Sequence, residues 1–291
     1  MTADRRQAVR RVWLSLSFSA TILAAELAGG LIAHSLALLA DGWHMLADIV
    51  ALGITQWAFW YASRPAQQHR SFGNLRSEIL AAFGNGLLLI VVAVWIFVSA
   101  WQRFQHPQPV LGGWMFGFAL VSTLLNGLSS WILHTDNAEN LNQRGAFLHV
   151  LGDLAGAVGA LIAAVVIRLT GWHLVDPAVS VLIGLFVTFT AVQLLRDSAA
   201  VLMEEVPSGL SVAEILETIE KIDDVISVHD LHIWTVTSGF VSLSCHLQIT
   251  VGADEQTVID RVSRKLYERY GIKHTTIQVE RSHPLGIHAD L

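Results

Sequence analysis

The chain has 291 residues, of which 53% are hydrophobic and 14% are charged, a composition typical of a membrane protein rather than a soluble one. The formal net charge of −6 and the lack of a basic patch with interleaved aromatic residues argue against nucleic acid as a partner. A single cysteine, Cys245, excludes an intramolecular disulfide and a thiolate-rich zinc cluster, so any metal ligands must be histidines and carboxylates.

The first predicted element is a membrane helix that follows a basic N-terminal arm, residues 1–11. Its apolar run is too long for a cleaved signal sequence and lacks a small-residue cleavage site. A span needs about 20 apolar residues, and six stretches meet that requirement: 12–33, 36–61, 77–101, 112–133, 146–169 and 175–195. The sequence therefore predicts a polytopic α-helical domain with six transmembrane helices over residues 12–202.

Arginines in the predicted loops set the orientation of these spans. One side holds Arg5, Arg6, Arg10, Arg11, Arg64, Arg70, Arg76, Arg144 and Arg196, and the other holds Arg103 and Arg168. Because basic loops stay in the cytoplasm, both termini are expected there. We expect the lipid bilayer that holds the chain to be a bacterial inner membrane.

A different pattern begins after residue 202, where Pro207, Ser208 and Gly209 interrupt the apolar run. The spacing Ser211-x-x-Glu214 predicts a helix start. Alternating β-rich stretches over 226–236 and 240–251, a helix over 254–270 and a strand over 275–280 follow. The order αββαβ predicts a small cytoplasmic α+β domain of ferredoxin-like type over residues 203–291. Its small core favours a homodimer.

Two membrane helices each carry a histidine and an aspartate four residues apart: His44 with Asp48, and His149 with Asp153. Residues at this spacing lie one turn apart on the same helical face. If the two faces meet, two nitrogens and two oxygens converge, and this ligand set suits tetrahedral Zn²⁺. The small residues Gly42, Ala47, Gly53, Gly152, Gly156 and Gly159 are expected to let the helices approach closely.

Structural explanations compete with this metal site. A lone intramembrane histidine can satisfy a backbone carbonyl, and a histidine–aspartate pair can be structural. An aspartate near the bilayer centre, however, costs about 2.5 to 3.5 kcal/mol on insertion scales and is normally kept for function. Asp41 is expected to be an entry ligand or, preferably, a hydrogen-bond partner of the ligands. Glu26 and Asp176 are expected to pair helices or cap a helix end.

Three features of the sequence resemble the cation diffusion facilitator family, in its zinc-transporting bacterial branch. They are the two histidine–aspartate pairs, the segment from Asn140 to Asp153 and the motif His229-Asp230-Leu231-His232. The resemblance covers residues 13–280. It implies a homodimeric metal/proton antiporter with a metal-binding cytoplasmic domain, and it implies that His44 favours zinc and cadmium over manganese.

The same resemblance implies a cytoplasmic metal site at His229 or His232, His246 and Glu280, where zinc would be structural or regulatory. Cys245 is expected on the opposite sheet face from His246, as a buried apolar residue. Some members have a further site in the loop after the second span. Here only His69 remains of it, because Asn74 replaces the second expected histidine.

The predicted function is therefore zinc efflux by metal/proton antiport, with Cd²⁺, Co²⁺, Ni²⁺ and Fe²⁺ as further substrates that the ligand set permits. An intramembrane zinc enzyme is an alternative, but it would need a helical His-Glu-x-x-His arrangement, which the sequence lacks. A passive divalent cation channel is a second alternative. It predicts metal flux that does not respond to a pH gradient.

Overall fold

The computed structural model describes residues 3–64, 69–135 and 141–280, and the side chains of 18–64, 69–131 and 150–280. The described residues form two compact units. The first, here called the membrane unit, comprises Met1–Ile54 and Gly84–Leu194. The second comprises Thr55–Phe83 and Leu195–Leu291. Each unit is described by itself below.

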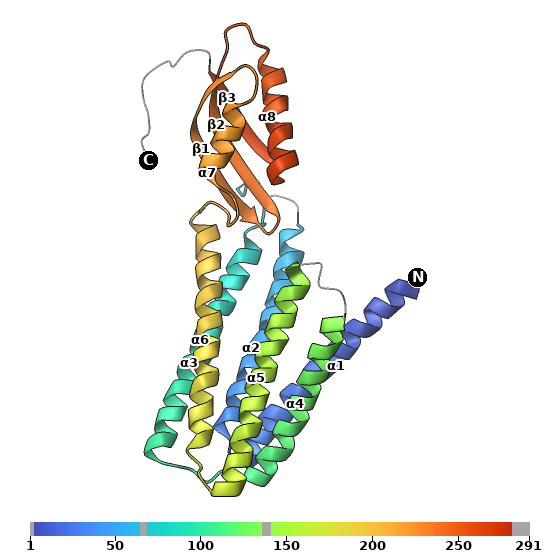
Figure 1. Ribbon diagram of the computed structural model, residues 1–291, viewed down its shortest axis with the longest axis vertical. Helices are drawn as coiled ribbons and strands as arrows, with labels where there is room; N and C mark the ends of the chain where they lie inside the picture. The colour runs from blue at the N-terminus through green and yellow to red at the C-terminus, as the bar shows by residue number, and fades with distance from the viewer. Residues whose placement is uncertain (1–2, 65–68, 136–140, 281–291) are drawn as a thin grey trace. The chain divides into compact units, whose positions relative to one another are not determined.

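Six long helices follow one another along the chain (Figure 1). They are α1 (Ala3–Ala33), α2 (Leu36–Ala62), α3 (Ser77–Gln105), α4 (Gly112–Thr135), α5 (Leu141–Thr170) and α6 (Val175–Leu202). Their bounds contain all six predicted apolar stretches. Among the described residues, four helices are long and apolar enough to cross a membrane: α2, α3, the Val150–Thr170 part of α5, and α6. A membrane domain of apolar helices is thus confirmed, while spanning by α1 and α4 stays a prediction.

Small side chains fill the centre of the membrane unit. Its core is rich in buried alanines, including Ala33, Ala37, Ala93, Ala119 and Ala160, and α4 packs against both α1 and α5. Large apolar side chains such as Leu124, Leu169 and Phe189 are instead exposed. A soluble protein rarely shows so much exposed apolar surface, whereas a bilayer solvates it.

The αββαβ order predicted for the C-terminal part is confirmed. It consists of α7 (Val212–Glu220), β1 (Val225–Thr237), β2 (Phe240–Ile249), α8 (Glu255–Tyr270) and β3 (His274–Glu280). Ser211 caps α7 by accepting a hydrogen bond from the backbone N–H of Glu214, as predicted. Gly271, with φ of 70°, ends α8 in the left-handed conformation that glycine favours.

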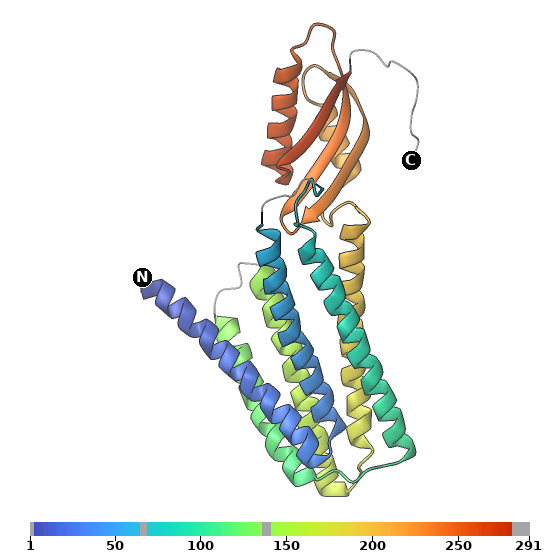
Figure 2. The same cartoon turned by 180° about the vertical axis from the view of Figure 1, so that it is seen from behind.

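The three strands form one sheet in the order β1-β2-β3 (Figure 2). Strand β2 pairs antiparallel with β1 and parallel with β3. Leu243, Cys245, Leu247 and Ile249 of β2 are buried in a core with α7 and α8. Since side chains alternate along a strand, the even-numbered residues, including His246, lie on the opposite face. The predicted burial of Cys245 is confirmed.

Within the second unit, the start of α3 contacts the β1–β2 hairpin. The Glu78 carboxylate accepts hydrogen bonds from the Thr237 and Ser238 hydroxyls at 2.6 and 2.8 Å. Nearby, the Arg76 guanidinium donates to the Glu204 carboxylate at 2.5 Å. These charge-assisted bonds connect the α2–α3 turn region with the α+β domain.

Candidate metal sites

The first predicted pair, His44 and Asp48, lies on one face of α2. The distance from His44 Nε2 to Asp48 Oδ2 is 3.7 Å, and the His44 side chain is almost fully buried. The Asp48 side chain is partly exposed. Burying the His44 imidazole among apolar helices is costly unless it binds a partner. The spacing of four thus places an imidazole and a carboxylate next to each other, as the sequence predicted.

Asp153 of α5 lies at the same cavity as His44. This cavity has a volume of about 220 Å³ and lies between α2, α5 and α6. Its lining comprises Asp41, His44, Gly152, Asp153, Ala155, Gly156, Gly159, Val179, Leu182, Ile183 and Phe186. The structure therefore brings the aspartate-bearing face of α5 to the histidine-bearing face of α2. Sequence reasoning missed the contribution of α6, because its apolar residues carry no ligand signal.

The side chain of His149 lies outside the described side chains. Its backbone belongs to α5, four residues before Asp153, so it stands one turn along the helix. Its role as a fourth ligand stays a prediction.

Glycines allow the helices to approach around this cavity. A Cβ at Gly152 would lie 2.5 Å from the Phe186 ring, and one at Gly42 would lie 2.8 Å from Leu27. Both distances are too short for real contacts, so a side chain at either position would force its neighbour to move. Among the described residues nothing lies within 4 Å of a Cβ built at Gly53, so no close helix contact requires a glycine there.

Asp41 and Glu26 lie side by side next to the cavity. Both carboxyl groups are buried and within hydrogen-bonding reach of each other. Glu26 also accepts a hydrogen bond of 2.5 Å from the Ser122 hydroxyl of α4, which confirms its predicted role in helix pairing. Asp41 thus contacts the Glu26 side chain of α1 as well as lining the cavity with His44 and Asp153.

A second cluster lies on the open face of the sheet in the α+β domain. His229 Nε2 is 3.3 Å from Glu280 Oε2, and His246 Nδ1 is 3.1 Å from Glu280 Oε1. One ligand atom from each of these three residues lies within 4.8 Å of the others. The pairing of His229 opposite His246 in the β1–β2 ladder explains how residues distant in sequence meet. Two imidazoles and a carboxylate match the ligand chemistry of zinc.

Asp230 joins this cluster, although the sequence did not predict it as a metal ligand. Its two oxygens lie 2.8 Å from His232 Nε2 and 3.6 Å from His246 Nε2. Its backbone has φ of 51°, and the β1–β2 register shifts between His229 and His232. A β-bulge at this point re-aims the side chains. Consequently His229 joins His246 and Glu280, whereas His232 contacts Asp230.

The loop after α2 contains the remaining candidate, His69, which is exposed. Asn74, at the position of a second expected histidine, is buried and accepts a hydrogen bond from Arg70. This contact gives Asn74 a structural role in the loop. The doubt about a metal site at His69 stays a prediction.

Comparison with known proteins identifies both parts of the chain. Residues 12–203 match the cation efflux transmembrane domain, and residues 207–282 match the cytoplasmic domain of cation efflux proteins. The chain is 41% identical to the zinc transporter ZitB of Escherichia coli strain K12, over 93% of this chain and 87% of that protein. It is also 41% identical to the metal cation efflux system protein CzcD of Cupriavidus metallidurans, over 93% and 86%.

A third relative is the cadmium, cobalt and zinc/H(+)-K(+) antiporter of Bacillus velezensis, which is 40% identical over 88% of this chain and 83% of that protein. Among solved structures, the metal-bound C-terminal domain of the CzcD transporter is 35% identical, with a TM-score of 0.24, over 24% of this chain and 99% of that chain.

The family matches cover the helices that carry His44 and Asp153 as well as the sheet that carries His246. They confirm the predicted transporter class over an intramembrane enzyme. These matches, together with the sequence identity to ZitB over nearly the whole chain, show the family. The chain belongs to the cation diffusion facilitator, or cation efflux, family of metal transporters.

Proposed function

We propose that this protein exports Zn²⁺ across the membrane in exchange for protons, through a site formed by His44, Asp48, His149 and Asp153. The observation that carries the proposal is the cavity between α2 and α5, where His44 and Asp153 converge with Asp48 one turn from His44. The relatives, a zinc transporter and a cadmium, cobalt and zinc antiporter, support the same reaction.

The ligand chemistry supplies the coupling to protons. A metal-bound imidazole must be neutral and a metal-bound carboxylate ionised, so protons compete with the metal for the same atoms. Histidine titrates near neutral pH. Protons entering from an acidic exterior would displace the metal outward, and their loss to the cytoplasm would restore the empty ligands.

Zinc is the proposed main substrate because two nitrogens and two oxygens suit its tetrahedral preference. Cd²⁺ and Co²⁺ are proposed as further substrates, because the Bacillus velezensis relative is a cadmium, cobalt and zinc antiporter. The ligand set alone also permits Ni²⁺ and Fe²⁺. Metal choice therefore depends on the geometry that the helices impose.

The proposed location is a bacterial inner membrane, with both termini in the cytoplasm. The excess of arginines in the loops on the N-terminal side supports this orientation. In this arrangement residues 1–11 form a cytoplasmic arm, residues 12–202 the membrane domain and residues 203–291 the cytoplasmic domain.

We also propose that the chain works as a homodimer and that its cytoplasmic domain binds zinc at His229, His246 and Glu280. The three-stranded domain has a small core, and small domains are commonly stabilised by association or a metal. Asp230 is placed to bind the same ion or to orient His246. Zinc there would be structural or regulatory.

Zinc uptake into proteoliposomes under an imposed pH gradient tests the transport proposal. Asp48→Ala and Asp153→Ala should abolish pH-driven flux. Asp197→Ala, which removes an exposed carboxylate of α6, is the matched control and should transport like the wild type. Flux that persists in both site variants, or flux that ignores the pH gradient, would contradict the proposal.

A further inference from the structure

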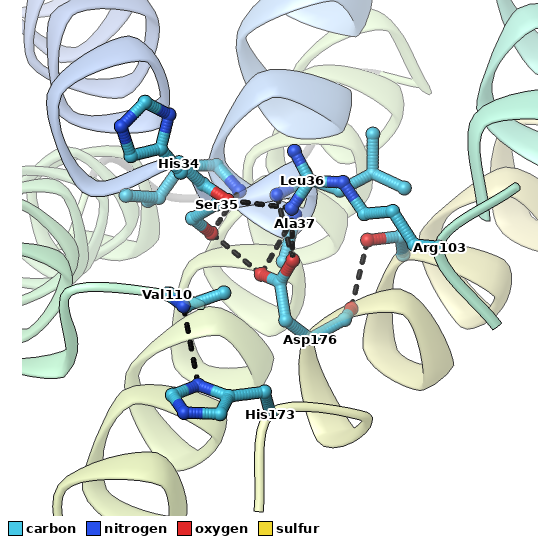
Figure 3. Close-up of polar contacts among 10 residues, drawn as sticks. His34, Ser35, Leu36, Ala37, Arg103, Val110, His173 and Asp176 are labelled. Carbon is cyan, nitrogen blue, oxygen red and sulfur yellow. Dashed lines mark hydrogen bonds and ion pairs between the residues drawn. The ribbon is translucent and has the colours of Figure 1, made fainter. Parts of the chain in front are cut away.

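Asp176, in the first turn of α6, is a fully buried carboxylate at one end of the membrane unit. It accepts hydrogen bonds from the Ser35 hydroxyl at 2.6 Å and from the backbone N–H groups of Leu36 and Ala37 at 2.7 and 3.1 Å. Arg103 of α3 forms an ion pair with it at 3.1 Å. Figure 3 shows these four donors converging on the one carboxyl group.

The sequence predicts that Asp176 pairs helices or caps a helix end, and it does both at the start of α2 rather than at the start of its own helix. Its carboxylate instead binds the first N–H groups of α2, which have no acceptor within their own helix. A negative charge at this point also interacts favourably with the positive end of the α2 dipole. A residue of α6 therefore closes the N-terminus of the helix that carries His44 and Asp48.

Neighbouring contacts extend this cluster to the other helix ends (Figure 3). Arg103 donates a hydrogen bond of 2.5 Å to the carbonyl of His34, just after α1. The N–H of Val110 donates to His173 Nδ1 at 3.1 Å, joining the α3–α4 and α5–α6 connections. Leu111, before α4, donates its N–H to the carbonyl of Ala33 at 2.9 Å. We call this set the outer junction: residues 33–37, Arg103, Val110, Leu111, His173 and Asp176.

The outer junction holds together the helices that enclose the cavity. Ala37 precedes His44 by seven residues, about 10 Å along an α-helix, and Val179, which lines the cavity, follows Asp176 by three. Both α2 and α6 line the cavity and run from it to this end of the membrane unit. These are the two helices that Asp176 joins directly.

We propose that the outer junction is the release gate of the transporter and that Asp176 is its positioning residue. The bonds from Asp176 to the first turn of α2 close the route from the cavity to the exterior. They break in each cycle when metal leaves and form again afterwards. This inference rests on the proposed transport function and orientation. It adds a residue that does not bind the metal but controls access to the site.

A buried carboxylate that loses its partners is strongly destabilised, so the closed gate is favoured whenever no other change compensates. The gate is therefore expected to stay shut at rest and to open only during turnover. Weakening the bonds of Asp176 should therefore open the gate at rest. The same change should slow transport, because the cycle requires the route to close again, while zinc affinity changes little.

A cysteine at Ala37 reports whether the gate is open, because Ala37 is fully buried and donates to Asp176 through its backbone N–H, which the substitution keeps. Full-length Ala37→Cys protein in proteoliposomes is treated with a membrane-impermeant maleimide on the side that receives zinc. Cys245 gives little background, because it is buried and its pKa is raised to about 11 by burial. Labelling should be at least fivefold faster during zinc transport than at rest. Equal rates would overturn the proposal.

Gate variants supply the second arm of the test. In the Ala37→Cys background, Asp176→Asn and Arg103→Gln should each raise resting labelling about tenfold. Without the cysteine, they should lower the maximal zinc flux with the KM for zinc changed less than twofold. Ser180→Ala is the matched control, because Ser180 bonds only the backbone carbonyl of Asp176 among the described contacts. It should match the wild type in both measurements.

The two proposals fail in different ways. Flux that survives in Asp153→Ala contradicts the transport site, whatever the gate variants do. If Arg103→Gln equals Ser180→Ala in both resting labelling and zinc flux, the gate proposal is contradicted. This holds even when the transport site is intact. Arg103→Gln also serves if Asp176→Asn does not fold, because Arg103 is partly exposed.

Discussion

Gly156 of α5 lies directly against the Asp41 carboxyl group of α2: a Cβ at this glycine would be 2.9 Å from Asp41 Oδ1. A methyl group at that position must displace either the carboxyl group or the helix. Since Asp41 and Asp153 line the same cavity, the contact sets the spacing of the helices that carry the proposed ligands.

Gly156→Ala should therefore lower zinc flux by at least about tenfold, because a displacement near 1 Å is sufficient to disrupt a coordination site. Gly53→Ala is the matched control, since nothing lies within 4 Å of a Cβ there. It should transport like the wild type. Proteoliposome flux measures both variants, and equal flux in the two would show that the Gly156 contact does not control the site.

His44→Asp should change metal selectivity more than it changes protein stability. The substitution replaces an imidazole nitrogen with a carboxylate oxygen, and oxygen ligands favour harder ions such as Mn²⁺. The ratio of manganese flux to zinc flux should rise at least about tenfold. Competition assays in proteoliposomes measure this ratio. A variant that transports both metals in the wild-type ratio would show that His44 does not discriminate between them.

His246→Ala and Glu280→Gln should weaken zinc binding to the cytoplasmic domain. To isolate this site, both variants are made in an Asp48→Ala, Asp153→Ala background and titrated calorimetrically at full length. Affinity should fall by at least about tenfold, because each change removes one of the three clustered ligands. His69→Ala, which removes an exposed loop histidine, should bind zinc with unchanged affinity. An equal loss in that control would contradict the assignment.

The same titration should depend on pH. Bound imidazoles must be neutral, so protons compete with zinc at His229 and His246. Zinc affinity is expected to fall as the pH is lowered from 7.5 to about 6, the range in which histidine titrates. Binding that is independent of pH would show that histidines are not the ligands.

Cys245 gives a prediction for alkaline pH. Burial raises the pKa of its thiol to about 11, above the usual value of about 8.5 for an unfolded chain. Between these values the unfolded state loses its proton first, so folding stability falls as the pH rises through this window. Urea unfolding at pH 8 and pH 10 measures the decrease, and Cys245→Ala should show a smaller one. Equal decreases would exclude the thiol as the cause.

Several features of this protein follow from local sequence alone. Apolar runs such as 77–101 predict helices because a bilayer requires internally bonded backbone, and α3 contains that run. The spacing of His44 and Asp48 predicts that they share a helical face, because the period of the α-helix fixes it. Ser211 and Gly271 mark helix ends through capping chemistry that involves only nearby backbone groups.

Other features depend on which elements pack together, and only the tertiary structure decided them. The sequence left His229 and His232 as alternatives, and a bulge in β1 selects His229 as the partner of His246 and Glu280. The sequence around Asp176 is typical of a residue that caps the start of its own helix. Its carboxylate instead binds N–H groups of α2, about 140 residues earlier in the chain. Local patterns determine periodicity and helix ends, whereas the partner of a buried charge is set by long-range packing, which no short stretch of sequence encodes.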